Sequence, residues 1–323
     1  MTLQDVAEAA GVSRATAGRV LAGTDRNVGA ALARRVEEAG ARLGYRGNAA
    51  ARALRTTSTR SVGVVVPSLR NPYFVALVEE VSGQLAGSGR SLLLAESADD
   101  VRVEASRISA LLASFTDSIL VVPVSHADSG AAVMAAARAV PVVQVDRWAD
   151  GADLPSVGVD NGAGVRLLVD HLRSRGARRL LYVGAEETSS SGRERAEAFR
   201  ALRAPGDAEL TLPVFTIDAG RRAALAVLAS GPLPDAVLCA ADVLALGVLS
   251  GLQSAGVVVP RDLMVAGFDD TDLLRLVTPQ ITSVRPPVAA IVRAALDLLG
   301  GSSAPVHRTL ISPALAVRES SSW

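Results

Sequence analysis

The strongest constraint on the fold is a regular alternation, from Ser61 onward, of short apolar runs with amphipathic helical stretches. The runs are continuously apolar, which is typical of parallel strands that are buried on both faces. They are Val62–Val66, Leu92–Leu94, Ile119–Val122, Val142–Val145, Leu180–Val183, Val214–Ile217, Val237–Cys239 and Met264–Ala266. These are too many strands for one modest sheet, so we expect an α/β core of two similar lobes with parallel sheets. The break between the lobes is expected near Asp160-Asn161.

Composition narrows the class of protein. Apolar residues make up 49% of the 323 residues, which is enough for a large core, and Cys239 is the single cysteine. A chain without a disulfide framework fits a reducing cytoplasm. The first residues lack a signal-peptide pattern and no apolar run approaches the ~20 residues of a membrane span, so we expect no membrane partner. The absence of lysine excludes a P-loop lysine and a Schiff-base lysine.

The first sixty residues have a different pattern, that of short helices. Thr2 is expected to cap a first helix together with Asp5, Gly11-Val12 forms a turn, and Ser13 caps a second helix that ends at Leu21. A third helix is expected to end at Gly44. Residues 1–60 contain ten Arg against five Asp or Glu, a net charge of +5, whereas residues 61–323 carry −5. A basic head on an acidic body suggests that only the head binds a polyanion.

Two short helices separated by a glycine-containing turn predict a helix-turn-helix. The early residues of the second helix would then face base edges in the major groove. Arg14 can donate two hydrogen bonds to a guanine edge, and Ala15 can contact a thymine methyl. Ser13, Thr16 and Arg19 suit phosphate contacts. The alternative is a small helical bundle that has no role in DNA binding.

The head resembles that of the lactose/galactose repressor (LacI/GalR) family. The resemblance lies in the segment Leu3 to Thr16, in Arg19-Val20-Leu21, and in Leu43 to Arg46 followed by Asn48-Ala49 and Ala51 to Arg55. It implies a hinge helix that folds on the operator, with Leu54 inserted into the minor groove and Arg55 beside it. We add Thr2, Asn27, Asn48 and Ala51 to the expected DNA contacts. Gly18 and Gly29 depart from the family pattern, which usually has Ser at both positions, so we expect a less stable head.

The rest of the chain resembles the periplasmic-binding-protein-like core of the same family. The markers include Val62 to Pro67, Asn71 to Phe74, Asp146-Arg147, Val159 to Asn161, Ala241-Asp242, Gly267 to Asp270 and Arg318 to Ser320. The resemblance implies a ligand crevice between two lobes, at the carboxyl ends of the strands. The expected effector-binding residues are Tyr73, Phe74, Asp146, Arg147, Trp148, Ser189, Ser191, Arg195, Asp242 and Asp269.

The chemistry of these residues favours a polyhydroxylated effector. Carboxylates accept hydrogen bonds from hydroxyls, Arg donates a planar pair, and aromatic rings can form an apolar wall. The resemblance adds that sugar-responsive members of the family carry hydroxyls in this loop, so Ser189 and Ser191 favour a sugar. The alternative interpretations are helix caps or turns for the aspartates, a surface loop for the serines, and simple packing for one of the two rings.

The leading prediction is therefore a homodimeric repressor that binds a near-palindromic operator and responds to a small molecule, most simply a sugar. The expected organisation is residues 1–46 as the DNA-binding domain, 47–60 as the hinge and 61–323 as the effector-binding and dimerisation domain. Lobe 1 is expected at about 61–160 and 288–313, and lobe 2 at about 161–287 and 314–323. A solute-binding protein without DNA function is the alternative. We expect no cofactor, no metal and no enzymatic activity, since the sequence contains no G-x-S-x-G elbow and its three histidines lack metal-ligand spacing.

Overall fold

The computed structural model describes residues 1–21, 28–45, 59–301 and 308–322. The chain forms two compact units, the head (Met1–Thr59) and the core (Arg60–Trp323). Nearly all of the expected hinge lies outside the described residues. So do five of the predicted DNA contacts: Asn27, Asn48, Ala51, Leu54 and Arg55.

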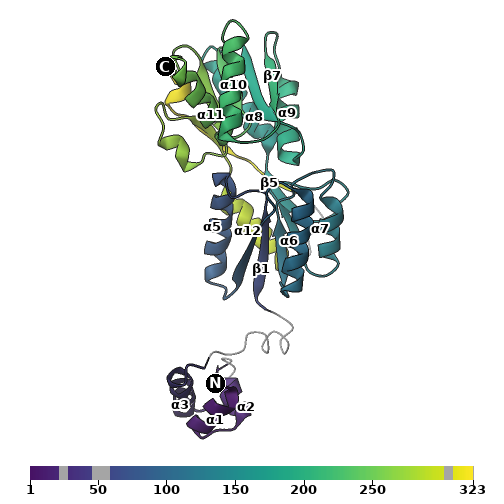
Figure 1. The fold of residues 1–323 in the computed structure, drawn as a ribbon, viewed down its shortest axis with the longest axis vertical. Helices are drawn as coiled ribbons and strands as arrows, with labels where there is room; N and C mark the ends of the chain where they lie inside the picture. Colours follow the sequence, from purple (N-terminus) through teal and green to yellow (C-terminus); the bar gives the residue numbers. More distant parts are fainter. Residues whose placement is uncertain (22–27, 46–58, 302–307, 323) are drawn as a thin grey trace. The chain divides into compact units, whose positions relative to one another are not determined.

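The described part of the head consists of helices α1 (Leu3–Ala10), α2 (Arg14–Leu21) and α3 (Ala30–Arg42), drawn in purple in Figure 1. The predicted capping box at the start of α1 is confirmed. Asp5 N–H donates to Thr2 Oγ1 at 3.3 Å, and Thr2 N–H donates to Asp5 Oδ2 at 2.8 Å. Gly11 ends α1 with φ 62°, a conformation that glycine adopts without steric cost.

A small apolar core holds the three head helices together. Val6, Ala17 and Val36 are completely buried in it. Arg35 Nε on α3 also donates a hydrogen bond to the carbonyl of Ala10, at 2.8 Å. This bond satisfies a carbonyl in the last turn of α1, which has no partner within the helix. The relation between the helices of the helix-turn-helix is therefore fixed by packing and by a polar tie.

Lobe 1 of the core is a parallel sheet with strand order β11-β5-β4-β3-β1-β2. Helices α5 and α12 cover one face of this sheet, and α6 and α7 cover the other. Alternate residues of β1 point to opposite faces, so Val64 packs with the first pair of helices and Val65 with the second. The strands are β1 (Ser61–Val66), β2 (Ser91–Glu96), β3 (Ser118–Val121), β4 (Val142–Val145), β5 (Ser156–Val159) and β11 (Arg308–Ile311), and the helices are α5 (Pro72–Ala86), α6 (Val101–Ala113), α7 (Gly130–Ala137) and α12 (Val288–Leu299).

Lobe 2 repeats this plan with strand order β12-β10-β9-β8-β6-β7, in which β12 alone runs antiparallel to its neighbour. The pairs α8/α9 and α10/α11 pack together on its two faces. The strands are β6 (Leu180–Ala185), β7 (Ala208–Leu212), β8 (Ala236–Cys239), β9 (Met264–Phe268), β10 (Thr282–Arg285) and β12 (Ala314–Ala316), and the helices are α8 (Asn161–Ser174), α9 (Ser190–Leu202), α10 (Ile217–Ala229), α11 (Asp242–Ser254) and the 3-10 turns η1 (Asp272–Arg275) and η2 (Glu319–Ser321).

The prediction of a strand at Val214–Ile217 is wrong. Those residues lie in the loop that follows β7 and at the start of α10, while β7 itself covers Ala208–Leu212. An edge strand such as β7 is only partly buried and can carry polar residues, which conceals it from an apolar-run criterion. The strands β5, β10, β11 and β12 were also missed, since each is either interrupted by polar residues or glycine or has only three residues.

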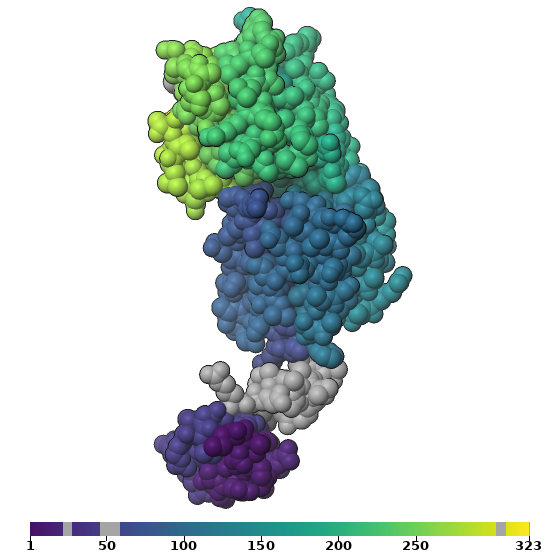
Figure 2. Space-filling view, viewed as in Figure 1, coloured from purple at the N-terminus to yellow at the C-terminus, as the bar shows by residue number. Residues whose placement is uncertain are grey.

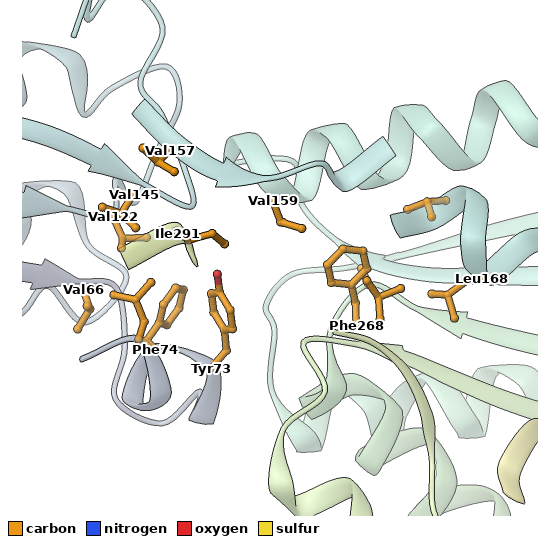
Figure 3. Packing of buried hydrophobic residues seen from close by; sticks show 14 of the residues in the cluster. Val66, Tyr73, Phe74, Val122, Val145, Val157, Val159, Leu168, Phe268 and Ile291 are labelled. Atoms are coloured by element: carbon orange, nitrogen blue, oxygen red, sulfur yellow. The ribbon is translucent and has the colours of Figure 1, made fainter. Parts of the chain in front are cut away.

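The chain passes between the lobes three times: from β5 to α8, from β10 to α12, and from β11 to β12. A single apolar cluster continues from lobe 1 into lobe 2, from Phe74 and Ile291 through Val159 to Phe268, as Figure 3 shows. Figure 2 shows the two lobes as distinct masses in contact, blue for lobe 1 and green for lobe 2. The two lobes are thus joined by three crossovers and meet at the carboxyl ends of their strands.

Candidate functional site

A small cavity of about 20 Å³ lies between the lobes. That volume accommodates roughly one water molecule. Its walls come from the loops that follow the strands of both sheets, where open α/β folds bind ligands. The lining residues are Asn71, Tyr73, Phe74, Asp146, Arg147, Ser191, Gly192, Arg195, Phe215, Ala241 and Asp269.

Asp146 brings a carboxylate into the cavity from the end of β4. Its backbone has φ 64°, in the left-handed region that residues with side chains rarely adopt, so the turn that aims it is strained. Tyr73 Oη donates a hydrogen bond to Asp146 Oδ1 at 2.7 Å, and Arg147 Nε lies 3.9 Å from Asp146 Oδ2. The Arg147 guanidinium in turn lies 5.2 Å from the centre of the Phe74 ring.

Lobe 2 supplies a second pair of charges, Arg195 and Asp269. Arg195 is held by hydrogen bonds to Asn161 Oδ1 and to the Ala240 carbonyl, both at 2.7 Å, and lies 3.6 Å over the ring of Phe268. Its Nη1 is 3.6 Å from Asp269 Oδ1. Asp269 follows β9 with φ 121°, again a strained conformation at the edge of the cavity.

Burial shifts the ionisation of the groups in this cavity. It raises the pKa of the Asp269 carboxyl well above its ordinary value, against the opposing effect of Arg195. It also lowers the pKa of Arg147 and, together with Asp146, raises that of Tyr73. Arg147 Nε and Asp269 Oδ1 are buried without a hydrogen-bond partner among the described residues. A donor and an acceptor left unpaired at the two sides of one cavity are suited to a ligand that carries both kinds of group.

Seven of the ten predicted effector contacts line this cavity: Tyr73, Phe74, Asp146, Arg147, Ser191, Arg195 and Asp269. The other three lie next to it in supporting positions. Ser189 caps α9 by accepting from Gly192 N–H at 3.2 Å, and Trp148 is covered by the Arg308 guanidinium at 3.0 Å. Asp242 lies deeper, where it accepts hydrogen bonds from Thr271 N–H and Ser283 Oγ, both at 2.7 Å.

Sequence reasoning missed four residues of the wall, namely Asn71, Gly192, Phe215 and Ala241. Asn71 had a signal, since its position just before the proline that opens α5 is a helix cap. Its Oδ1 accepts from Tyr73 N–H at 3.1 Å, which leaves the side-chain amide hydrogens for other partners. Phe215 was hidden by the wrong strand assignment for Val214–Ile217.

The start of α9 forms a set of polar contacts across the boundary between the lobes. Arg193 Nη1 donates to Asp150 Oδ2 at 3.1 Å and to His126 Nδ1 at 3.0 Å. Trp148 N–H donates to Ser190 Oγ at 3.0 Å, and Arg308 pairs with Glu194. Because Arg195 lies on the same helix, the element that forms the cavity wall also holds the lobes together.

Among the described residues, the predicted DNA contacts from Ser13 to Arg19 lie at the start of α2 and along it. Thr16 N–H donates to Ser13 Oγ at 3.1 Å, so the predicted cap of α2 is confirmed. Arg14, Ala15 and Arg19 are exposed, and Arg19 Nη2 donates to Thr16 Oγ1 at 3.4 Å. Thr2 is also exposed, and its side chain caps α1. A helix with an exposed N-terminal turn and arginines at its first and sixth positions has the geometry of a recognition helix.

A helix-turn-helix head followed by a two-lobed core with a polar cavity defines a ligand-responsive DNA-binding regulator. The chain matches the family model of bacterial regulatory proteins of the lacI family over residues 2–48 and that of the periplasmic-binding-protein-like domain over residues 169–321. It is 33% identical to the HTH-type transcriptional regulator reg1 of Streptomyces lividans, over 98% of this chain and 96% of that protein. The chain belongs to the LacI family.

Solved structures agree with this assignment. The lac repressor dimer bound to operator and the anti-inducer ONPF superimposes with a TM-score of 0.88 and 26% identity, covering 99% of both chains. The complex of the transcriptional regulator CelR with cellobiose gives a TM-score of 0.69 and 28% identity, again covering 99% of both chains. The family and the fold class expected from the sequence are thus confirmed, and the protein is a DNA-binding transcriptional regulator.

Two further observations concern other classes of function. No helix within the described ranges is long and apolar enough to cross a membrane. Among the same residues, no group of three or more His, Cys, Asp or Glu side chains is placed to hold a metal ion. The relatives named above are transcriptional regulators, a class that is not enzymatic.

Proposed function

We propose that this chain is a homodimeric repressor that binds a near-palindromic operator and dissociates from it when a sugar occupies the cavity between the lobes. The observation that carries the proposal is the convergence of two Asp–Arg pairs, Asp146/Arg147 and Asp269/Arg195, with aromatic rings on one enclosed space. Carboxylates accept from hydroxyls, guanidinium groups donate to them, and the rings can cover an apolar face of the sugar. The operator and cellobiose complexes of two relatives support both halves of the proposal.

Effector entry requires the lobes to separate. Small-molecule sites typically enclose several hundred Å³, and the cavity between the lobes measures about 20 Å³. The three crossovers are the positions at which the lobes can turn relative to each other. A sugar that contacts Asp146 on lobe 1 and Asp269 on lobe 2 therefore stabilises the arrangement of the lobes in which it reaches both residues.

The link to the operator runs through the segment that precedes β1. We propose residues 1–46 as the DNA-binding domain, 47–60 as the hinge and 61–323 as the effector-binding and dimerisation domain. A change in lobe 1 alters the position of Ser61, where β1 begins, and hence the separation of the two hinges in a dimer. A modest difference in effector affinity between two states of the core can then shift the operator affinity of the head.

The effector half of the proposal is tested by thermal shift. The wild type and Asp269→Ala are each heated with neutral sugars and with nucleosides, and Asp297→Ala serves as a control that removes an exposed carboxylate outside the cavity. A ligand at a hundred times its Kd stabilises the folded state by ~2.7 kcal/mol, which is a shift of several degrees. We expect a sugar to shift the wild type and the control but not Asp269→Ala. Stabilisation by nucleosides alone, or an undiminished shift in Asp269→Ala, contradicts the proposal.

The DNA half is tested by selecting duplexes from a random pool and comparing Arg14→Ala with Arg34→Ala, which removes an exposed arginine from α3. A bidentate contact from Arg14 to a guanine contributes ~1–3 kcal/mol of discrimination. We expect Arg14→Ala to lose tenfold or more on the selected duplex and much less on random DNA, whereas Arg34→Ala changes both by a similar, smaller factor. Equal losses on both duplexes in Arg14→Ala would assign Arg14 to the phosphates instead.

A further inference from the structure

The hydroxyl of Tyr73 occupies part of the polar wall of the cavity. Tyr73 lies in the first turn of α5, is 3% exposed, and meets Phe74 edge to face, with ring centroids 5.4 Å apart. Figure 3 shows the two rings side by side, with Tyr73 nearer to lobe 2. Phe74 packs against Arg147, whereas Tyr73 carries an oxygen that reaches Asp146 Oδ1 at 2.7 Å. The two neighbouring rings therefore play different parts in the cavity.

The hydrogen bond from Tyr73 changes what Asp146 can offer to a ligand. An ionised carboxylate accepts on both of its oxygens. Here Oδ1 already accepts from Tyr73, and Oδ2 faces Arg147 Nε at 3.9 Å. The strained backbone of Asp146, with φ 64°, is fixed by its hydrogen bond from Asp146 N–H to the Val157 carbonyl at 2.8 Å. The backbone that carries the carboxylate is thus held in place, and the hydrogen bond from Tyr73 restrains one of its two oxygens.

We propose that the Tyr73 hydroxyl is a specificity-determining group that takes the place of one hydroxyl of the effector at Asp146. Of the two positions from which a hydroxyl can donate to Asp146 Oδ1, one is already filled by the Tyr73 oxygen, and an effector can use only the other. The wild type therefore prefers a sugar that carries hydrogen, rather than a hydroxyl, at the carbon that faces this oxygen. The inference rests on the proposed sugar site, since it specifies which pattern of hydroxyls that site accepts.

The Tyr73→Phe substitution reverses this preference. Removing the oxygen leaves Asp146 Oδ1 without a donor and opens space for one hydroxyl group. A buried acceptor that lacks its partner is costly, so a ligand that supplies the missing hydroxyl gains affinity relative to one that does not. We expect the ratio of the affinity for a deoxy sugar to that for its parent sugar to fall about tenfold or more in Tyr73→Phe.

The experiment measures Kd by isothermal titration for pairs of sugars that differ in one hydroxyl. The pairs are ribose with 2-deoxyribose, glucose with 2-deoxyglucose and 6-deoxyglucose, and galactose with 6-deoxygalactose, all with the full-length protein. Tyr182→Phe is the matched control, because it removes the same group from a buried tyrosine that stacks on Phe199 at 5.1 Å and does not line the cavity. The control is expected to keep the wild-type ratio for every pair.

The possible outcomes separate this inference from the proposed function. A tenfold change of the ratio in Tyr73→Phe, absent in Tyr182→Phe, supports the inference. Equal loss of affinity for both members of a pair overturns it, since Tyr73 then acts only through packing. Ratios that stay within twofold of the wild type in every pair also overturn it, while sugar binding itself stands. If no sugar binds the wild type, the proposed sugar site and this inference fall together.

Discussion

The free energy of unfolding of the core should depend on pH through Asp242. The substitution Asp242→Asn should remove that dependence. The carboxylate is completely buried at the start of α11 and accepts from Thr271 N–H and Ser283 Oγ. Burial raises the pKa of Asp242 to about 7, although both hydrogen bonds oppose the shift. In Asp242→Asn the amide oxygen can still accept from Thr271, and the amide hydrogens can donate to Ser283 Oγ. The substitution therefore preserves the shape of the site and removes the ionisation.

The sign of the effect follows from proton binding in the two states. In the unfolded chain the Asp242 carboxyl ionises near pH 4, whereas in the folded core it keeps its proton up to about pH 7. Between these values the folded state binds more protons, so its stability falls as the pH rises. The slope contributed by one such group is on the order of 1 kcal/mol per pH unit. The stability that the protonated Asp242 carboxyl contributes is fully present below pH 4 and is lost as the pH rises through 7.

The assay is urea unfolding of the full-length protein at several pH values from 5 to 8, monitored by tryptophan fluorescence, to which Trp148 in the core contributes. Other carboxyls also have a raised pKa, including Asp269 and Glu104, so the informative quantity is the difference between variants. Asp242→Asn should lose less stability between pH 5 and pH 8 than the wild type, by one to a few kcal/mol. Asp297→Asn, at an exposed site, is the control and should follow the wild type. Parallel curves for the wild type and Asp242→Asn would refute the reasoning.

Three further predictions concern packing, capping and the contacts between the lobes. Gly29→Ser should stabilise α3 by a few tenths of a kcal/mol in thermal unfolding, because Gly29 is an N-cap without a side-chain hydrogen bond and a Cβ there meets nothing within 4 Å; a lower Tm would contradict this. Gly247→Ala should lower the urea midpoint of the core, at a cost of ~1–3 kcal/mol or more. The added Cβ would lie 2.0 Å from the Ile217 carbonyl oxygen. An unchanged midpoint would show that α10 and α11 can separate. Asp150→Asn weakens the ion pair with Arg193 that joins the two lobes. Because Asp150 is about half exposed, the effector Kd should rise by less than about fivefold. Tighter effector binding in this variant would show that the ion pair does not help to hold the lobes together around the effector.

The head was predictable from the sequence because its signals are local. The capping box of Thr2 and Asp5, the Gly11 turn and the Ser13 cap each depend on residues within four positions of one another. A contact that local patterns do not encode is the hydrogen bond from Arg35 to Ala10, which joins residues 25 positions apart.

The core was only partly predictable, for reasons of length and exposure. Central strands such as β1 and β8 are buried along their whole length and appear as apolar runs. The strands β10 and β11 carry an arginine at one end and owe their strand conformation to partners distant in the sequence. A pattern that considers neighbours alone cannot register that pairing.

The candidate site shows the same division. Asp146 and Asp269 could be located from their places after apolar runs, because carboxyl ends of parallel strands meet at one edge. The inward orientation of Asp242 could not be predicted, since a residue at the start of a helix can face the cavity or the sheet beneath it. The packing of Arg308 over Trp148 brings together residues 160 positions apart, and Trp148 is not among the residues that line the cavity.

Occupation of the cavity by a sugar should control operator binding by the head. The decisive measurement is the fluorescence anisotropy of a labelled inverted-repeat duplex, selected from random DNA, titrated with full-length protein with and without the sugar that gives the largest thermal shift. The account predicts a clear preference for the inverted repeat over random duplex and a rise of the operator Kd by tenfold or more when the sugar is present, lost in Asp269→Ala. No preference for any inverted repeat, or tighter operator binding with the sugar, would contradict it.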